Sequence, residues 1–294
     1  MASLKAIRRR IASTKSTQQI TRAMKLVSAA RLRRAQEALL NARPYSEALA
    51  RITDSLFASE RAMGGPPEGA ARVSLCAVIS SDRGLCGGYN ANLLRVAEEV
   101  RRNAGSTGLE VQFYAVGKKA ADYFNRANVQ VAASAINNTP RLATVELARR
   151  IASRMLADYQ SGAICEAAIV YTQFKSVLAQ RPMFERLLPV APPGPGAERE
   201  NAPLPTEYLL EPSREALAPV IMRAYLESAV FHALLEAEAS EQGARMAAMD
   251  NATNNAIEMI NRYTIEMNRT RQAQITRELM DIVGGAEALR GGEG

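Results

Sequence analysis

Two long segments, one at each end of the chain, are almost free of glycine and proline, and they constrain the fold more than any other feature. Residues 3–58 contain no glycine and one proline, Pro44, while residues 213–283 contain one glycine, Gly243, and one proline, Pro219. Such composition predicts continuous helices of about 80 and about 105 Å at 1.5 Å per residue. Isolated helices of this kind are unstable in water unless they bury an amphipathic face. We therefore expect the two ends to pair as an antiparallel coiled coil.

Apolar residues recur in both segments at steps of three and four, which is the spacing of a helical stripe. Pro44 is expected to bend the first helix or to end a segment of it, and Gly284–Gly285 to stop the second. The two stripes are expected to bury each other, and their members include Leu4, Ile7, Ile11, Ile20, Met24 and Val27 in the first segment and Ile257, Ile260, Met267, Ile275, Leu279 and Ile282 in the last.

The middle of the chain alternates short apolar runs with helical patterns, which favours an inserted α/β domain with a mainly parallel sheet. Thr139 and Pro140 have the residue types of a helix cap and first turn, and the proline-rich stretch 189–205 reads as a loop. The expected strands are 74–80, 111–116, 129–131 and 167–174, with an edge strand at 183–190, and the expected helices are 92–103, 118–125 and 141–160. The predicted boundaries are 1–60 for the first coiled-coil helix, 61–211 for the α/β domain, 212–286 for the second helix and 287–294 for a tail.

Composition excludes several function classes. The aromatic content is 5% with no tryptophan, which suits close helix packing better than a pocket lined with rings. Three cysteines without CxxC spacing and a single histidine make a zinc site improbable and fit reduced thiols in a cytoplasmic compartment. No apolar stretch approaches the ~20 residues of a membrane span, and the basic N-terminus lacks the apolar region of a signal peptide. We expect membrane contact only through partners.

The first helix is strongly basic, within a chain whose net charge is +7. Ten Lys or Arg residues precede the first acidic residue, Glu37, so intrahelical ion pairs are excluded over that stretch. A solvated face is the plainer interpretation, and contact with an acidic partner is the one that we favour. The ten are Lys5, Arg8, Arg9, Arg10, Lys15, Arg22, Lys25, Arg31, Arg33 and Arg34.

The last helix has polar stretches at 250–255 and 268–272, made of residues with mediocre helix propensity. Simple exposure would account for them. The alternative is a face that touches another surface through hydrogen bonds without holding it permanently, since large apolar patches would lock such a contact.

The glycine-rich loop 81–90 follows an expected strand and precedes an expected helix, a context that can cradle phosphate. It lacks the Lys-Ser/Thr of a P-loop and the GxGxxG spacing, so a structural turn is favoured. Cys86 has no nearby base in the sequence, because the only histidine, His232, falls in the distant last helix. The sequence predicts no catalytic residue, no metal and no cofactor, so we expect a protein that is not an enzyme by itself.

Four motifs, in order along the whole chain, resemble those of the gamma subunits of F-type ATP synthases. They are KSTQQITRAMKLV at 15–27 followed by RPY at 43–45, SSDRGLCGGYN at 80–90, EQGARMAAM at 241–249 and RQAQITREL at 271–279. The resemblance implies a rotor shaft that turns inside a ring of alpha and beta subunits, with its α/β domain and the epsilon subunit standing on the membrane c-ring. It also implies ATP synthesis driven by proton flow, with the chain peripheral at the cytoplasmic face of a bacterial inner membrane.

The same resemblance implies where partners bind. Tyr208 and Glu211 would face the membrane rotor ring. The residues that would contact the catalytic ring are Arg9, Lys15, Arg22, Met24, Lys25, Arg245, Arg271, Gln272 and Thr276.

Two other function classes remain open on the sequence. A basic coiled coil that binds nucleic acid would lose affinity steeply with salt, yet no aromatic residue lies among the basic residues before Tyr45. A small-molecule enzyme built on the glycine-rich loop would bind nucleotide saturably and lose that binding when Gly87 is substituted. We expect neither behaviour, and in particular no nucleic acid.

Overall fold

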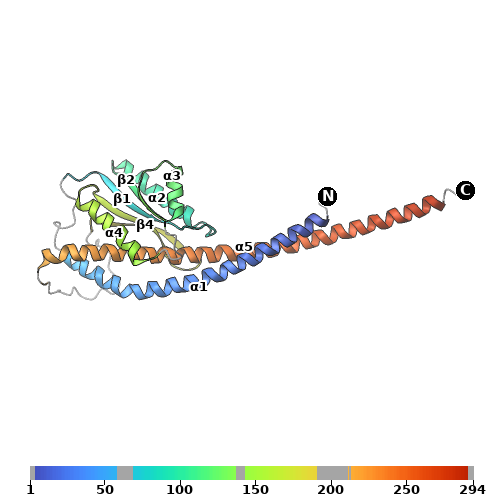
Figure 1. Ribbon diagram of the computed structural model, residues 1–294, viewed down its shortest axis with the longest axis horizontal. Helices are drawn as coiled ribbons and strands as arrows, with labels where there is room; N and C mark the ends of the chain where they lie inside the picture. Colours follow the sequence, from blue (N-terminus) through green and yellow to red (C-terminus); the bar gives the residue numbers. More distant parts are fainter. Residues whose placement is uncertain (1–3, 58–68, 137–142, 191–210, 212, 291–294) are drawn as a thin grey trace. The chain divides into compact units, whose positions relative to one another are not determined.

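The computed structural model describes residues 4–57, 69–136, 143–190, 211 and 213–290. Two long helices, α1 (Leu4–Phe57) and α5 (Arg214–Arg290), enclose the α/β part in chain order (Figure 1). Between them lie β1 (Val73–Ile79), α2 (Tyr89–Ser106), β2 (Glu110–Val116), α3 (Lys118–Arg126), β3 (Val131–Ala135), α4 (Val145–Gln160), β4 (Glu166–Phe174) and β5 (Gln180–Leu188). Contacts divide the chain into unit 1 (Met1–Val27 with Ala248–Gly294) and unit 2 (Ser28–Ala247).

The sheet of unit 2 has the strand order β3-β2-β1-β4-β5. The first four strands are parallel, and β5 returns antiparallel to β4 through a tight hairpin. The mainly parallel α/β fold predicted from the sequence is therefore confirmed, including the edge strand. Because β1 has its sequence neighbour β2 on one side and β4 on the other, the strand order reverses between β1 and β4.

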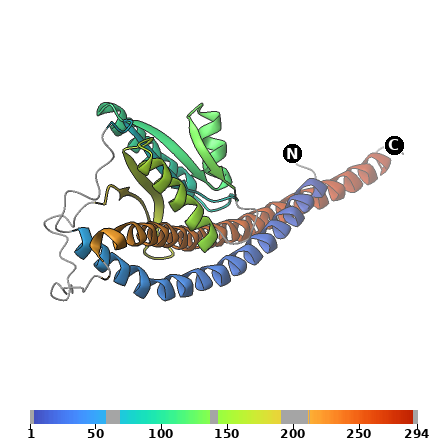
Figure 2. The same cartoon turned by 60° about the vertical axis from the view of Figure 1, so that its left-hand side comes forward.

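Helices cover both faces of this sheet (Figure 2). One face packs α2 and α3 through residues such as Leu93 and Phe124 against Val78 and Phe113. The other face packs α4, the first half of α5 and Leu56 at the end of α1. Apolar side chains on alternate positions of β1 point to opposite faces, so the strand reads as a continuous apolar run in the sequence.

Several predicted boundaries are wrong for local reasons. Helix α4 begins at Val145, because the Thr144 side chain accepts a hydrogen bond from the Leu147 amide at 3.2 Å and so caps it. The predicted cap, Thr139 with Pro140, lies outside the described residues. Strand β3 follows the predicted 129–131 run instead of coinciding with it, since Asn128 turns the chain with φ of 53°.

Both long helices also run through residues that were expected to interrupt them. Helix α1 continues through Pro44, and α5 continues through Gly284 to Arg290. A glycine costs a helix only about 1 kcal/mol relative to alanine, and alanine, glutamate and leucine follow this pair. Helical residues therefore extend into the segment that the sequence assigned to the tail.

The helix seam of unit 1 differs from the apolar stripe expected from the sequence. The more buried α1 positions alternate steps of four and three, as in a coiled coil, but several of them are polar. Ile20 and Val27, expected in the seam, are instead exposed. The seam residues are Ile7, Ile11, Thr14, Gln18, Thr21 and Lys25 on α1 and Met249, Thr253, Ala256, Ile260, Tyr263 and Met267 on α5.

Candidate functional site

The place where a doubly wound sheet usually binds its ligand is occupied here by the chain itself. Ligands bind such sheets beyond the carboxyl ends of the strands, where the strand order reverses. In this protein α5 contacts the end of β4, one of the two strands that flank that point, and the loop that follows the other strand, β1. The Ser240 hydroxyl donates to the Thr172 carbonyl of β4 at 2.9 Å, and the Phe174 amide donates to the Glu236 carboxylate at 2.7 Å.

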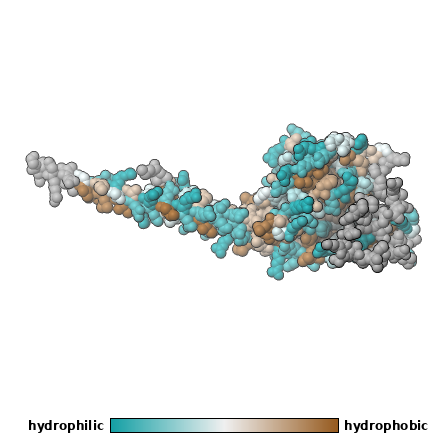
Figure 3. All heavy atoms as spheres, turned by 180° about the vertical axis from the view of Figure 1, so that it is seen from behind, coloured by the Kyte–Doolittle hydropathy of each residue, from teal (hydrophilic) through white to brown (hydrophobic). Residues whose placement is uncertain are grey.

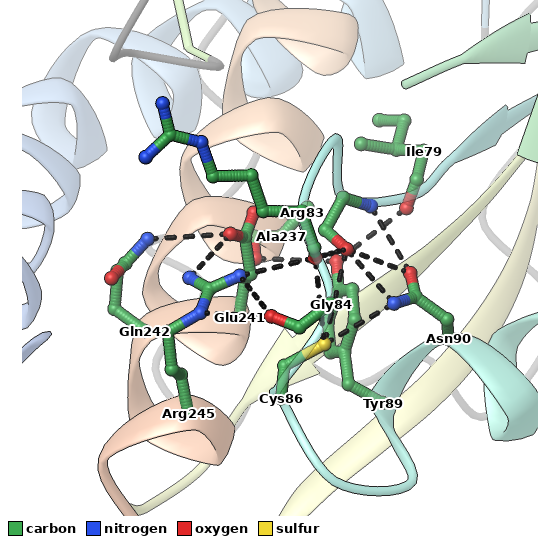
Figure 4. A network of polar contacts seen from close by, with 11 residues as sticks. Ile79, Arg83, Gly84, Cys86, Tyr89, Asn90, Ala237, Glu241, Gln242 and Arg245 are labelled. Carbon is green, nitrogen blue, oxygen red and sulfur yellow. Dashed lines mark hydrogen bonds and ion pairs between the residues drawn. The ribbon is translucent and has the colours of Figure 1, made fainter. Parts of the chain in front are cut away.

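The loop after β1 is held by Arg245 of α5 (Figure 4). The Arg245 guanidinium donates to the carbonyls of Arg83 and Gly84 at 3.2 and 3.3 Å, and it forms an ion pair with Glu241 at 2.6 Å. Both side chains of the pair are about nine-tenths buried. We call the Glu241–Arg245 pair with the Arg83 and Gly84 carbonyls the clasp.

Burial dominates the electrostatics of the clasp. Desolvation raises the pKa of Glu241, and the neighbouring Arg245 charge and its hydrogen bond oppose that rise. The negative charges of Glu238 and Asp82 add to the rise. An arginine suits this position because its planar fork serves a carboxylate and two carbonyls at once. The clasp thus neutralises a buried charge while fixing a loop that has no regular structure.

Other polar groups in and beside the loop also bond within the chain. The Ser81 amide and hydroxyl bond to the Asn90 side chain at 3.1 and 3.0 Å. Ser80 and Asp82 accept hydrogen bonds from the first amides of α3, Ala120 and Lys118, at 2.8 and 2.9 Å. The loop is a braced structural turn, as the sequence favoured over a phosphate cradle, and its side chains also cap a helix.

Groups that could perform chemistry are unsuited to it in this arrangement. Cys86 is buried against Tyr89 and Ala244, and burial raises the pKa of its thiol, which disfavours the reactive thiolate. His232 lies 3.8 Å from the Glu236 carboxylate, on its own helix. Among the described residues, no three His, Cys, Asp or Glu side chains gather as a metal site would require. The described helices also include none with the length and hydropathy of a membrane span.

Leu85 is a residue that the sequence analysis missed. It has φ of 64°, a conformation that is strained for a branched side chain, and its side chain is 62% exposed. The clasp on one side and buried Cys86 on the other hold the loop in this conformation. The sequence signal was an apolar residue next to a glycine, which does not distinguish an exposed side chain from a buried one.

The predicted partner-binding residues of α1 lie in unit 1, and three of them, Arg9, Lys15 and Arg22, are exposed. Met24 and Lys25 are half-buried. Lys25 forms an ion pair with Asp250 of α5 at 2.6 Å. The basic side chains of α1 within unit 1 therefore stay exposed when the two helices pair, except at Lys25, which contacts Asp250 of α5.

The other predicted residues fall into three environments. Arg271, Gln272 and Thr276 are exposed on α5, and the structure adds only a bond from the Thr276 hydroxyl to its own helix at 3.0 Å. Arg245 belongs to the clasp, so its donors already have partners within the chain. Glu211 is exposed, and Tyr208 lies outside the described residues.

The end of α5 extends past the start of α1 within unit 1 (Figure 1). The bonded pairs Thr21–Thr253 and Lys25–Asp250 set a register in which Leu4 lies opposite about residue 270. Every residue from 271 to 284 is exposed. Figure 3 shows apolar and hydrophilic atoms interspersed along the surface of these helices, and Leu279 and Ile282 contribute apolar surface there.

The comparisons with known proteins agree along the full chain. The family model described as ATP synthase matches residues 3–289. The ATP synthase gamma chain of Moorella thermoacetica is 44% identical over 294 residues, covering 99% of this chain and 100% of that protein. The corresponding protein of Pelotomaculum thermopropionicum is 42% identical over 295 residues, with 98% and 100% covered. The chain belongs to the ATP synthase gamma chain family.

Solved structures show the same fold at lower identity. The rotor of the Euglena gracilis mitochondrial ATP synthase in rotational state 1 matches with a TM-score of 0.68 at 21% identity, covering 92% of this chain and 98% of that one. The central stalk and c-ring structure from Tetrahymena thermophila matches with a TM-score of 0.60 at 24% identity, covering 79% and 99%. Membership of the gamma chain family thus rests on sequence, and these likenesses confirm the arrangement of paired helices with an inserted α/β domain.

Proposed function

We propose that this chain is the central rotor shaft of an F-type ATP synthase. It would transmit rotation between a proton-driven c-ring in the membrane and a ring of alpha and beta subunits that bind nucleotide. The observation that carries the proposal is the end-to-end match to ATP synthase gamma chains at 42–44% identity. The structural likenesses are to a rotor and to a central stalk with its c-ring, which is the same place in the machine.

The physical character of unit 1 suits a part that must touch changing partners. Its surface combines exposed cations such as Arg22 with exposed polar side chains such as Gln272 and scattered apolar ones. An exposed ion pair stabilises a contact by about 1 kcal/mol or less, so no single pair would hold the shaft at one angle. We propose that Arg9, Lys15, Arg22, Met24, Lys25, Arg271, Gln272 and Thr276 contact the catalytic ring.

Arg245 would act within the chain. Its guanidinium already binds Glu241 and two loop carbonyls, so direct contact with the catalytic ring would need it to leave the clasp. We propose that it instead fixes the loop that presents Leu85 to a neighbouring subunit. Contact of Arg245 itself with the ring stays a prediction.

A different segment of the chain would meet the membrane ring. We propose that the segment around Tyr208 and Glu211, together with an epsilon subunit, faces the c-ring, which places the chain peripherally at the cytoplasmic face of a bacterial inner membrane. The chain would set which catalytic site is active by shifting the relative stability of subunit conformations, without chemistry of its own. The occupied switch point and the buried thiol of Cys86 support a non-catalytic role. No comparison supports the nucleic-acid alternative.

The direct test is purification of a tagged chain from its native membrane. We expect a ring of nucleotide-binding subunits to accompany it, and ATP hydrolysis by the complex but not by the free chain. A chain that emerges alone, or with nucleic acid that is lost at high salt, would contradict the proposal.

A charge reversal tests the basic surface in the assembled complex. Arg22→Glu should slow ATP hydrolysis by the complex by about fivefold, because a contact of about 1 kcal/mol becomes repulsive and 1 kcal/mol corresponds to about fivefold in a rate constant. Arg51→Glu is the matched control, since Arg51 is exposed on the same helix outside the basic run. Equal effects of the two variants would remove the basic surface from the mechanism.

A further inference from the structure

The middle of the seam between the two helices of unit 1 is polar on its α1 side, whereas Ile7 and Ile11 nearer the start of α1 are apolar. Near residues 14–25 the α1 side of the seam is Thr14, Gln18, Thr21 and Lys25, and Ala256 lies opposite Gln18. Over this stretch α1 has no large apolar side chain that must fit one particular hole of α5, so apolar packing here selects the register only weakly. Polar contacts in this stretch therefore add to the selection of the observed offset.

Two cross-helix contacts provide that selection. The buried hydroxyls of Thr21 and Thr253 lie 2.8 Å apart. The Thr253 hydroxyl also lies 2.7 Å from the Met249 carbonyl. The Thr21 hydroxyl also lies 3.1 Å from the Gln18 carbonyl of its own helix. The hydrogens balance if Thr21 donates to Thr253, at the shorter distance, and Thr253 donates to Met249. One helical turn along the helices, the Lys25 ammonium donates to the Asp250 carboxylate at 2.6 Å.

We propose that these two contacts, Thr21–Thr253 and Lys25–Asp250, form a register lock that holds the antiparallel helices at one axial offset. A slip of one heptad would place Thr21 opposite Ile260 or Met246 and would separate Lys25 from Asp250. Each slipped register then loses the hydrogen bond between the two hydroxyls and the ion pair. Single polar pairs in a helix seam are known to select register in this way.

The register lock rests on the proposed function, because a shaft whose two helices slid along each other would lose the rotation that it transmits. The lock itself is a property of the free chain and is measured without the ATP synthase. A failure of the register test would therefore leave the proposed function standing, and the reverse also holds.

Disulfide trapping on the full chain reports the register. Cysteines at Gln18 and Ala256 lie opposite each other in the observed register, whereas cysteines at Gln18 and Tyr263 meet only after a slip of one heptad. In the otherwise unaltered chain we expect cross-linking of the first pair alone. The lock-free variant carries Thr21→Val, Lys25→Ala, Asp250→Ala and Thr253→Val, and its slipped cross-link should increase on the order of tenfold.

A matched control removes two hydroxyls that have no part in the lock. Thr14 and Thr264 bond only to carbonyls of their own helices, at 2.9 and 2.7 Å, among the contacts of the described residues. Thr14→Val with Thr264→Val should leave both cross-link yields unchanged. A lock-free variant that cross-links only in the observed register, at the unaltered yield, would overturn the proposal.

A second variant keeps the proposal testable if the lock-free chain loses its helices. The lock-swapped variant carries Thr21→Ser, Lys25→Asp, Asp250→Lys and Thr253→Ser, so it keeps both contacts while changing all four side chains. We expect it to cross-link as the unaltered chain does. Slipped cross-links in this variant would show that packing, and not the two polar contacts, selects the register.

Discussion

Replacing Arg245 by methionine should release the loop after β1 while leaving the rest of unit 2 folded. Methionine keeps the apolar stem but removes the charge, so Glu241 stays buried without its partner and the Arg83 and Gly84 carbonyls lose their donors. Breaking a buried ion pair from one side costs about 3–5 kcal/mol, because an uncompensated charge remains. The Arg245→Met chain should therefore open at this loop far more often than the unaltered chain.

Hydrogen exchange measured by mass spectrometry on peptides covering residues 79–92 is the suitable assay, since it reports opening of a local region. At 1.36 kcal/mol per tenfold, 3–5 kcal/mol predicts exchange faster by about 150- to 5000-fold. A peptide covering β2, residues 110–116, should change far less. Arg262→Met, at an exposed position of the same helix, should alter opening by about 0.5 kcal/mol at most.

The paired change Glu241→Leu with Arg245→Met separates charge from packing. It removes both members of the buried pair, so no buried charge is left unpaired. The two loop carbonyls lose donors, at about 1 kcal/mol each, and the Gln242 amide loses its long 3.4 Å bond to Glu241. Exchange should then rise by about 30-fold, well below the single variant. Loop exchange in Arg245→Met within about threefold of the unaltered chain, or a double variant as open as the single one, would refute the view that the clasp holds this loop.

Two further predictions concern stability. Gly117→Ala should destabilise unit 2 by at least about 3 kcal/mol, because Gly117 has φ of 90° and an added Cβ would lie 2.2 Å from the Ser80 carbonyl oxygen. Urea unfolding followed by circular dichroism measures this loss. The control is Gly105→Ala, where a Cβ meets nothing within 4 Å, and it should be neutral or stabilise by about 1 kcal/mol. Burial raises the pKa of Tyr159 to about 12, so the folded state keeps a proton that the unfolded state loses above about pH 10, and stability should fall as pH rises between these values. Tyr159→Phe should flatten that fall in unfolding measured from pH 9 to 12, and an unchanged slope would contradict the assignment.

The sequence alone determined the secondary structure class and its order. Long segments without glycine or proline have few alternatives to helix, and the apolar run from Leu75 to Ile79 can be little else than a buried strand. Strand–helix alternation leads to a parallel sheet because parallel strands need a crossover, and an inserted α/β domain follows from that. The motifs also identified the family, because a motif is recognised from its residues and their order, without knowledge of the three-dimensional structure.

Tertiary structure decided which residues face inward and which polar groups are paired. Ile20 and Thr21 are neighbours in a helical pattern that favoured Ile20 for the seam, yet Thr21 is buried and Ile20 is exposed. Arg245 read as a partner-binding cation, and it proved to be committed to Glu241 and to a loop more than 150 positions away in the sequence. Helical periodicity specifies a face only to within the drift between 3.6 and 3.5 residues per turn. Pairing across such separations depends on the packing of whole elements, which no local window of residues contains.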